Sequence, residues 1–480
     1  MAVLSELEPK RVFHYFEEIC KIPHGSHNTK EISDYCVNFA RERNLSVIQD
    51  EANNVIIRKP GTEGCEDSET LILQGHLDMV CEKTPDSSHD FEKDGLKLWI
   101  QDGYVTAKDT TLGGDDGIAV AMMLAVLDSD EIVHPPLEAL FTSDEEVGMG
   151  GAGALNMDDL RGKMLINIDS EEEGILTAGC AGGFRFDTVI PVSYEKAEGE
   201  ALSIVIGGLT GGHSGCEIHK QRGNAHALMG RLLNHLRRQT PLRLAEIVGG
   251  KGDNVIAVKS EAKIAVSPKD KETCMNAVRK MERVWKDEFG EDEPGLYVEV
   301  TEDKADRVFA QADTNRVISY LSTMQNGVIC YERQVEGQVE TSLNVGIIQT
   351  SEREVIISHL VRSSMESKKW DLKERLFALA ELAGGKGEAR DEYPAWNYRK
   401  DSKLRELMVR VYQEMYGEKP QVLTIHAGLE CGLFVGKNPE LDCISFGPEI
   451  LDVHSVNERM NIKSVERSYK YLLEVLKAAK

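Results

Sequence analysis

The chain has 480 residues, which is too long for one compact core and therefore predicts two domains. Hydrophobic residues make up 41% and charged residues 29% of the chain, an ordinary composition for a globular protein. The formal net charge of -25 argues against nucleic acid or an anionic membrane surface as a partner, because both would repel an acidic exterior.

The cysteines and the first residues indicate the compartment. The ten cysteines are scattered without a Cys-x-x-Cys pair, which is typical of free thiols in a reducing environment. Residues 1–21 lack the charged and apolar regions of a signal peptide, and no apolar run approaches membrane-spanning length. We therefore expect a cytoplasmic protein with no membrane partner.

The first part of the chain leads to a buried strand that begins at Leu71. The elements expected before it are helices at 11–22 and 30–43 and strands at 45–49 and 55–58. After Gly75 the strand ends in His76 and Asp78, which should emerge side by side because strand residues two apart share a face. Either a metal binds there, with the carboxylate orienting the imidazole, or the strand simply enters a polar loop.

Acidic residues recur where further strands end or a helix begins. The sequence Leu112-Gly-Gly-Asp-Asp-Gly precedes a helix at 118–127, and two adjacent acids between glycines exceed what an N-cap requires. Ser143-Asp-Glu-Glu-Val-Gly follows a strand at 137–142, and Asp169 follows a strand at 164–168. Alternating strands and helices predict a largely parallel sheet, in which ligands bind beyond the carboxyl ends of the strands.

The character of the sequence changes between Phe186 and Tyr393. The expected elements there are a strand at 202–207, a helix at 225–238, paired strands at 254–258 and 262–266, a helix at 272–289, a strand at 297–301, a helix at 315–324, strands at 342–350 and 354–361, and a helix at 372–382. This order recurs weakly and indicates two related α+β halves of an inserted domain.

The tail returns to the first pattern. Its expected elements are helices at 403–416, 428–434 and 465–479 and strands at 422–425 and 442–446. We therefore expect one domain formed by residues 1–183 and 396–480, with a second, inserted domain at 184–395.

Seven residues from these motifs are candidates for a metal site. They are His76, Asp78, Asp115, Glu145, Glu146, Asp169 and His454. Nitrogen and oxygen donors without cysteine suit zinc, with cobalt or manganese as alternatives. Two histidines and three carboxylates hold two metals if one carboxylate bridges them. Each acid alone would be read as a surface carboxylate, and it is their corresponding positions that favour a site.

The motifs together resemble the co-catalytic zinc dipeptidase and aminoacylase family. The motifs that carry the resemblance are Gly75-His-Leu-Asp-Met-Val, Leu112-Gly-Gly-Asp-Asp-Gly, Thr142-Ser-Asp-Glu-Glu-Val-Gly, Asn167-Ile-Asp-Ser, Gly211-Gly-His-Ser-Gly, Ile425-His-Ala-Gly-Leu-Glu-Cys-Gly and His454-Ser-Val-Asn-Glu-Arg. The resemblance implies an α/β fold: a zinc-exopeptidase-like catalytic domain with a mixed, largely parallel sheet, plus an inserted α+β lid domain.

The resemblance also implies roles for the candidate residues. It assigns His76 and Asp169 to one metal, Glu146 and His454 to the other, and Asp115 to a bridge between them. Glu145 would be the general base, and Asp78 would orient and polarise His76. Asp116 competes with Asp115 for the bridge, and Gly114 stands where alanine is commoner in the family.

Three lid residues are implied as well. His213 would donate a hydrogen bond to the tetrahedral oxyanion, with a reach across a homodimer interface as one arrangement. Asn254 and Arg362 would bind the terminal carboxylate of the substrate, for which an arginine fork is well suited. His219, His426 and Glu430 line the pocket in one interpretation, and in the other they are ordinary buried or surface polar residues.

The expected activity is metal-dependent hydrolysis of dipeptides, with either a preference for Xaa-His or a broad specificity. The alternatives on the same scaffold are a tripeptide aminopeptidase and an N-acyl amino acid deacylase. A non-catalytic peptide-binding protein is a further alternative, against which a free acid at Glu145 argues.

Overall fold

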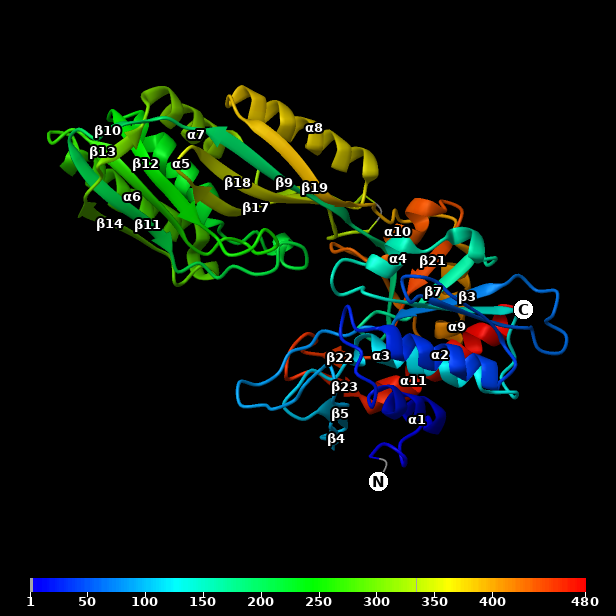
Figure 1. The fold of residues 1–480 in the computed structure, drawn as a ribbon. Helices are drawn as coiled ribbons and strands as arrows, with labels where there is room; N and C mark the ends of the chain where they lie inside the picture. The colour runs from blue at the N-terminus through cyan, green and yellow to red at the C-terminus, as the bar shows by residue number, and fades with distance from the viewer. Residues whose placement is uncertain (1–2, 334) are drawn as a thin grey trace. The chain divides into compact units, whose positions relative to one another are not determined.

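The computed structural model describes residues 3–333 and 335–480, which form two compact units. Unit 1 comprises residues 1–179, 398–424 and 429–480, and unit 2 comprises residues 180–397 and 425–428. Figure 1 shows the chain from blue to red, with the green and yellow segments in unit 2. No helix within the described ranges is long and apolar enough to cross a membrane.

Unit 1 is built on an eight-stranded sheet. Its strands, in spatial order, are β1 (Ser46–Gln49), β2 (Val55–Lys59), β6 (Leu137–Thr142), β3 (Leu71–His76), β7 (Met164–Asn167), β21 (Asp442–Ser445), β8 (Ile175–Cys180) and β20 (Gln421–Ile425). The four central strands from β6 to β21 are parallel, whereas β1, β2 and β8 pair antiparallel with their neighbours. The expected α/β fold with a mixed, largely parallel sheet is confirmed.

The helices of unit 1 come from both the first and the last parts of the sequence. They are α1 (Lys10–Ile19), α2 (Lys30–Glu42), α3 (Gly114–Leu127), α4 (Gly150–Ala154), α9 (Lys403–Tyr416), α10 (Glu430–Lys437) and α11 (Ile462–Ala478), with a 3-10 turn η1 (Met157–Asp159). Figure 1 shows the blue α1 and α2 close to the orange and red α9 and α11, and all four contribute to one hydrophobic core. Helix α3 is apolar around its whole circumference and is buried, because it packs on both α1 and β3.

A second, small sheet in unit 1 supports the loop that carries His454. Its order is β22 (Ile450–Leu451), β23 (Arg459–Asn461), β5 (Tyr104–Ala107) and β4 (Leu98–Gln101). Within this sheet β4 and β5 form a short antiparallel hairpin.

Unit 2 contains a sheet whose two halves have the same topology. The strands in spatial order are β14 (Tyr297–Asp303), β11 (Glu200–Gly207), β13 (Ser260–Val266), β12 (Leu242–Gly249), β17 (Val339–Thr350), β18 (Glu354–Ser363), β9 (Gly182–Pro191) and β19 (Lys386–Tyr393), and β16 (Gly327–Tyr331) also pairs with β17. Each half has four strands. From the outer edge of the sheet inward, these are the last, first, third and second strands of that half in chain order. The helices that pack on it are α5 (Ala225–Arg237), α6 (Lys271–Phe289), α7 (Gln311–Thr323) and α8 (Glu366–Leu382).

Several short elements of unit 2 complete it. They are the strands β10 (Tyr194–Lys196) and β15 (Arg307–Phe309), which pair with each other, and the 3-10 turns η2 (Ile218–Lys220) and η3 (Gly290–Asp292).

The prediction of a strand at 254–258 is wrong. The partner of β13 is β12 instead, while the backbone at 254–258 bonds to the turn before α5 and to the first residue of α5. Ile256 donates to the carbonyl of Gly212, and Ala225 donates to the carbonyl of Ala257. An apolar run does not reveal which hydrogen-bond partners its backbone will find. Here the partners lie in a loop and at a helix start, not in a neighbouring strand.

Candidate metal centre

His76 is the last residue of β3 and is almost fully buried. Its Nδ1 lies 2.9 Å from the carbonyl oxygen of Asp78 and therefore donates to it, which leaves Nε2 with a lone pair. That Nε2 lies 3.0 Å from Asp115 Oδ1 and 3.7 Å from Asp169 Oδ1. The imidazole is thus oriented with its ligand nitrogen facing two carboxylates.

Asp115, in the first turn of α3, lies between the two candidate histidines. Its Oδ1 faces His76 Nε2, and its Oδ2 lies 3.2 Å from His454 Nε2. His454 Nε2 also lies 3.1 Å from Glu146 Oε1, so that Asp115, Glu146 and His454 form one group of possible ligands. His454 has a positive φ of 59°, in the loop between β22 and β23.

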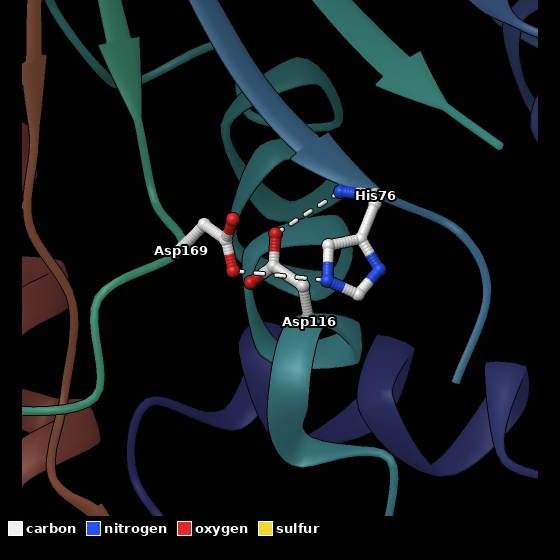
Figure 2. A group of neighbouring side chains, drawn as sticks. All are labelled: His76, Asp116 and Asp169. Carbon is white, nitrogen blue, oxygen red and sulfur yellow. Dashed lines mark hydrogen bonds and ion pairs between the residues drawn. The ribbon is translucent and has the colours of Figure 1, made fainter. Parts of the chain in front are cut away.

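Asp116 points to a different place. Figure 2 shows it at the start of α3 with its carboxylate directed toward the backbone of His76, while Asp169 reaches the imidazole ring from the loop after β7. Its Oδ2 accepts the His76 backbone N–H at 3.0 Å. His76, Asp116 and Asp169 nevertheless form a second group whose ligand atoms lie within 4.8 Å of one another. The Asp115 carboxylate therefore faces both His76 and His454, whereas the Asp116 carboxylate faces His76.

Asp78 fixes the loop that carries the two glutamates. Its Oδ1 accepts the backbone N–H of Glu145 at 2.9 Å, and its Oδ2 accepts that of Glu146 at 3.3 Å. Ser26 Oγ also donates to Oδ2, at 2.8 Å. Because Asp78 also lies 3.5 Å from His76 Nδ1 through Oδ1, one buried carboxylate holds the imidazole and the glutamate loop together.

The charges of this cluster are suited to bound cations. Burial raises the pKa of Asp169 well above its ordinary value, and the nearby Asp116 carboxylate adds to the rise. Hydrogen bonds with Asp115 and Glu146 raise the pKa of His454 to about 11, so in this arrangement a proton occupies the imidazole. Oxygen and nitrogen donors crowded in this way fit two divalent ions, whose charge would offset the mutual repulsion of the carboxylates.

Glu145 differs from the other acids of the cluster. Its side chain has no hydrogen bond or ion pair with any residue in the described ranges, although its backbone is held by Asp78. Burial raises the pKa of Glu145 to about 8, with the carboxylates of Glu430, Glu146 and Asp115 adding to the rise and His76 opposing it. With His76 and Glu146 it forms a third group of possible ligands, so this carboxylate without a hydrogen bond is placed either to bind an ion or to transfer a proton.

The predicted lid residues lie in unit 2. His213 Nδ1 accepts the backbone N–H groups of Gly215 at 3.2 Å and Cys216 at 3.1 Å, which places its proton on Nε2. Arg362 is 7% exposed, donates to the hydroxyl of Tyr393 at 3.1 Å, and has no partner for Nε among the residues described. Asn254 is exposed, and its backbone carbonyl accepts from Ser214 at 2.9 Å.

A glycine brings two of these side chains close. A Cβ placed on Gly215 would lie 3.0 Å from His213 Cε1, 3.1 Å from Arg362 Nε and 2.5 Å from the carbonyl of His426. His213 and Arg362 therefore border one space that only glycine leaves open. Burial lowers the pKa of His213, and the nearby Arg362 guanidinium lowers it further. The imidazole is therefore neutral.

Two of the three weaker candidates have structural partners. Glu430 is fully buried and accepts from Gln74 Nε2 at 2.6 Å and Thr142 Oγ1 at 2.8 Å. His426 Nε2 lies 2.7 Å from Ser342 Oγ, and His219 is exposed on η2.

One residue of the site had no predicted role. Glu458 belongs to the motif that begins at His454, and its buried carboxylate accepts backbone N–H groups next to Asp115. The motif itself was visible in the sequence, but the partner of this glutamate lies far away along the chain.

A group of histidines and carboxylates at the carboxyl edge of an α/β sheet, with a free glutamate beside it, defines a metal-dependent hydrolase. The chain belongs to peptidase family M20/M25/M40, whose family model matches residues 72–478. It is accordingly a peptidase, an enzyme that hydrolyses peptide bonds.

Two relatives at about 40% identity place the chain within this family, and a third protein shares its fold. It is 40% identical over 482 residues to the cytosol non-specific dipeptidase of Escherichia coli (strain K12), with 99% of each chain covered. The crystal structure of aminoacylhistidine dipeptidase from Vibrio alginolyticus matches with a TM-score of 0.94 and 39% identity, covering 99% of this chain and 98% of that one. A tripeptidase from Staphylococcus aureus subsp. aureus Mu50 shares the fold, with a TM-score of 0.60, 17% identity, and 98% and 99% coverage.

Proposed function

We propose that this chain is a dinuclear metal-dependent dipeptidase that hydrolyses the peptide bond of short unblocked peptides. The observation that carries the proposal is the single carboxylate of Asp115, which faces both His76 and His454. Glu145 lies close by, and its side chain has no hydrogen bond to any residue that the structure describes. The names of the two relatives matched at about 40% identity, both dipeptidases, support the same substrate class. Their names also favour either a broad specificity or a preference for Xaa-His.

The residues that would hold the ions are those expected from the sequence. His76 and Asp169 would bind one ion, Glu146 and His454 the other, and Asp115 would bridge them. Zinc suits this donor set best, with cobalt or manganese as alternatives. When bound, such ions acidify water and polarise the carbonyl of the substrate.

The protein residues would carry the proton and orient the groups. Glu145 takes a proton from the attacking water and returns it to the leaving amine as the peptide bond breaks. The charge of two cations would lower the pKa of Glu145 and so favour the carboxylate form that a base requires. Asp78 keeps His76 in the tautomer that offers Nε2, because it holds the other ring nitrogen.

Residues of unit 2 would bind the substrate. His213 has its Nε2 proton available as a donor to the oxyanion that forms in the transition state. Arg362 would pair with the terminal carboxylate of the peptide, since its Nε has no hydrogen-bond partner within the described residues, and Asn254 would add a polar contact.

Substitution of the base tests the proposal. We expect Glu145→Ala to retain two metal equivalents and to lose turnover by roughly 100-fold or more, the usual contribution of a general base. His454→Ala should lose one metal equivalent, measured by elemental analysis against wild type. Asp144→Asn, on the same turn, is the matched control and should do neither, because asparagine tolerates the positive φ of 53° at this position. Undiminished hydrolysis of a dipeptide by Glu145→Ala would refute the role of the base.

A substrate panel distinguishes the alternatives on this scaffold. Dipeptides, tripeptides and acetylated amino acids, offered to the metal-loaded enzyme, separate a dipeptidase from a tripeptide aminopeptidase and an N-acyl amino acid deacylase. A dipeptidase should hydrolyse the first group at least tenfold faster than the others. No turnover of any of them with added zinc or manganese would favour a peptide-binding protein.

Assembly and location complete the proposal. We expect a cytoplasmic homodimer, as the name of the Escherichia coli relative suggests for the compartment. Sedimentation at micromolar concentration and cell fractionation are the corresponding measurements.

A further inference from the structure

Glu458 links two distant segments of unit 1. It is 2% exposed and lies four residues after His454, where the loop re-enters β23. Its Oε2 accepts the backbone N–H groups of Leu112 at 2.7 Å and Gly113 at 3.1 Å, and its Oε1 accepts that of Gly114 at 2.8 Å. The N–H of Asp115 lies 3.4 Å from the same Oε1. Both carboxylate oxygens are therefore engaged by backbone donors of the segment that ends in Asp115.

The start of α3 is shaped to receive this carboxylate. The first N–H groups of a helix lack intrahelical partners and carry a partial positive charge, so they favour an anion. Gly113 has a φ of 65°, which turns its N–H toward the same point as those of its neighbours. A Cβ on Gly114 would lie 3.2 Å from Glu458 Oε1, which is a tight contact that glycine avoids.

The backbone of Glu458 is anchored independently of its side chain. Its carbonyl oxygen accepts from Thr106 Oγ1 at 2.8 Å, and its N–H donates to the carbonyl of Ser455 at 3.1 Å. The next residue, Arg459, pairs with Thr106 in the register of β23 and β5. The small sheet thus fixes the backbone of Glu458, and the carboxylate of Glu458 holds the start of α3 in place relative to that sheet.

These two segments are the ones that meet at the candidate metal centre. His454 stands on the loop that Glu458 closes, and Asp115 is the residue that follows the N–H groups Glu458 holds. The two ligand atoms, His454 Nε2 and Asp115 Oδ2, lie 3.2 Å apart although the residues are 339 positions apart in the chain. Glu458 is the direct link between the backbones that carry them.

We propose that Glu458 is a positioning residue that sets the affinity for the ion shared by Asp115, Glu146 and His454. It is not a ligand, because both of its oxygens already accept backbone hydrogen bonds. This inference rests on the proposed two-metal function, and it adds that one of the two ion sites depends on a carboxylate that never touches the ion. The other ion would share Asp115 but is otherwise held by His76 and Asp169, whose positions are fixed by β3, β7 and Asp78, so we expect it to depend on Glu458 much less.

The test is a metal titration of the metal-free protein. Glu458→Gln replaces one acceptor oxygen by an amide that points its own N–H groups at backbone donors. We expect wild type to bind two Mn²⁺ ions, and the variant to bind one with an affinity within threefold of wild type and the other at least tenfold more weakly. Turnover by the variant should recover when Mn²⁺ is raised, because the groups that act on the substrate are unchanged.

Glu449→Gln is the matched control. Glu449 precedes β22 on the same hairpin, and its Oε1 accepts side-chain donors only, from Tyr104 at 3.0 Å and Asn461 at 3.2 Å. This variant should bind both ions as wild type does. Glu458→Asp, which keeps the charge but is one methylene shorter, should weaken the same single ion, and it decides the question if the glutamine variant does not fold.

The possible outcomes are distinct. If Glu458→Gln and Glu458→Asp bind both ions as tightly as wild type, the positioning role is refuted while the dipeptidase proposal stands. The role is also refuted if both ions weaken together with a fall in the melting temperature of the metal-free protein, since that would indicate a merely structural residue. Wild-type protein that binds fewer than two ions would overturn the two-metal function and this inference with it.

Discussion

Removing the charge of Asp78 should loosen the metal centre without removing a ligand. Asp78 accepts hydrogen bonds from the backbones of Glu145 and Glu146 and from the hydroxyl of Ser26, and it lies beside His76. In Asp78→Asn one oxygen stays as a neutral acceptor, and the other position becomes a donor that faces donors.

The magnitude follows from these bonds. A hydrogen bond to a charged acceptor contributes about 1.5–3 kcal/mol, and a bond between neutral groups contributes about 0.5–1.5 kcal/mol. Losing one charged bond and weakening another therefore amounts to roughly 2–4 kcal/mol, divided between folding stability and ion affinity. We expect the share that reaches the metal centre to lower ion affinity by about 10- to 100-fold, as is usual for partners of metal ligands.

Calorimetric titration of the metal-free variant with Zn²⁺, alongside steady-state hydrolysis of a dipeptide, measures both effects. Asp144→Asn is the control, because Asp144 lies on the same turn but accepts from the backbone of His27, away from the cluster. An Asp78→Asn protein that binds both ions with wild-type affinity and keeps kcat/KM within threefold would show that this carboxylate does not organise the site.

Three further predictions concern protons, substrate and stability. The pKa of His454, raised to about 11 by bonds with Asp115 and Glu146, exceeds that of an unfolded histidine, so its contribution to metal-free stability is complete below pH 6.5 and is lost as pH rises toward 11. Ion binding at pH 8 must then release this proton, and calorimetry in buffers of different ionisation enthalpy should detect it; heats independent of the buffer would contradict the assignment. Arg362→Met should raise KM for a dipeptide at least tenfold with a smaller change in kcat, and it should not affect a substrate whose terminal carboxylate is amidated. Glu138→Gln should lower the free energy of unfolding by about 1–3 kcal/mol, because this buried carboxylate accepts two backbone N–H groups and an arginine; equal urea midpoints would count against it.

The sequence was sufficient for the elements and motifs that local patterns encode. The strands that end near His76, Thr142 and Asn167 are mostly apolar, as buried parallel strands usually are, with Gln74 and Glu138 as buried polar exceptions. Their polar residues follow at the carboxyl ends, so the position of a site at that edge could be predicted before any pairing was known. Helix α9 has the expected bounds, because a strong amphipathic period and a glycine at 417 mark them.

Local patterns were insufficient where partners come from elsewhere in the chain. The run at 254–258 is apolar enough for a strand, yet its backbone donors found acceptors in a loop, and β12 took the place beside β13. Asp115 and Asp116 are adjacent and chemically identical in the sequence. Only the folded backbone turns one toward both histidines and the other toward the amide of His76.

The sequence by itself determined which residue types this protein brings to its chemistry, because most of them stand at or just after a strand end or helix start that local periodicity marks. The tertiary structure alone decided which of them meet: His454 reaches Asp115 across 339 positions, and Glu458 binds the amides before it. Hydrophobic periodicity reports burial, whereas a contact between distant side chains depends on how the sheet and loops pack, and no local pattern contains that information.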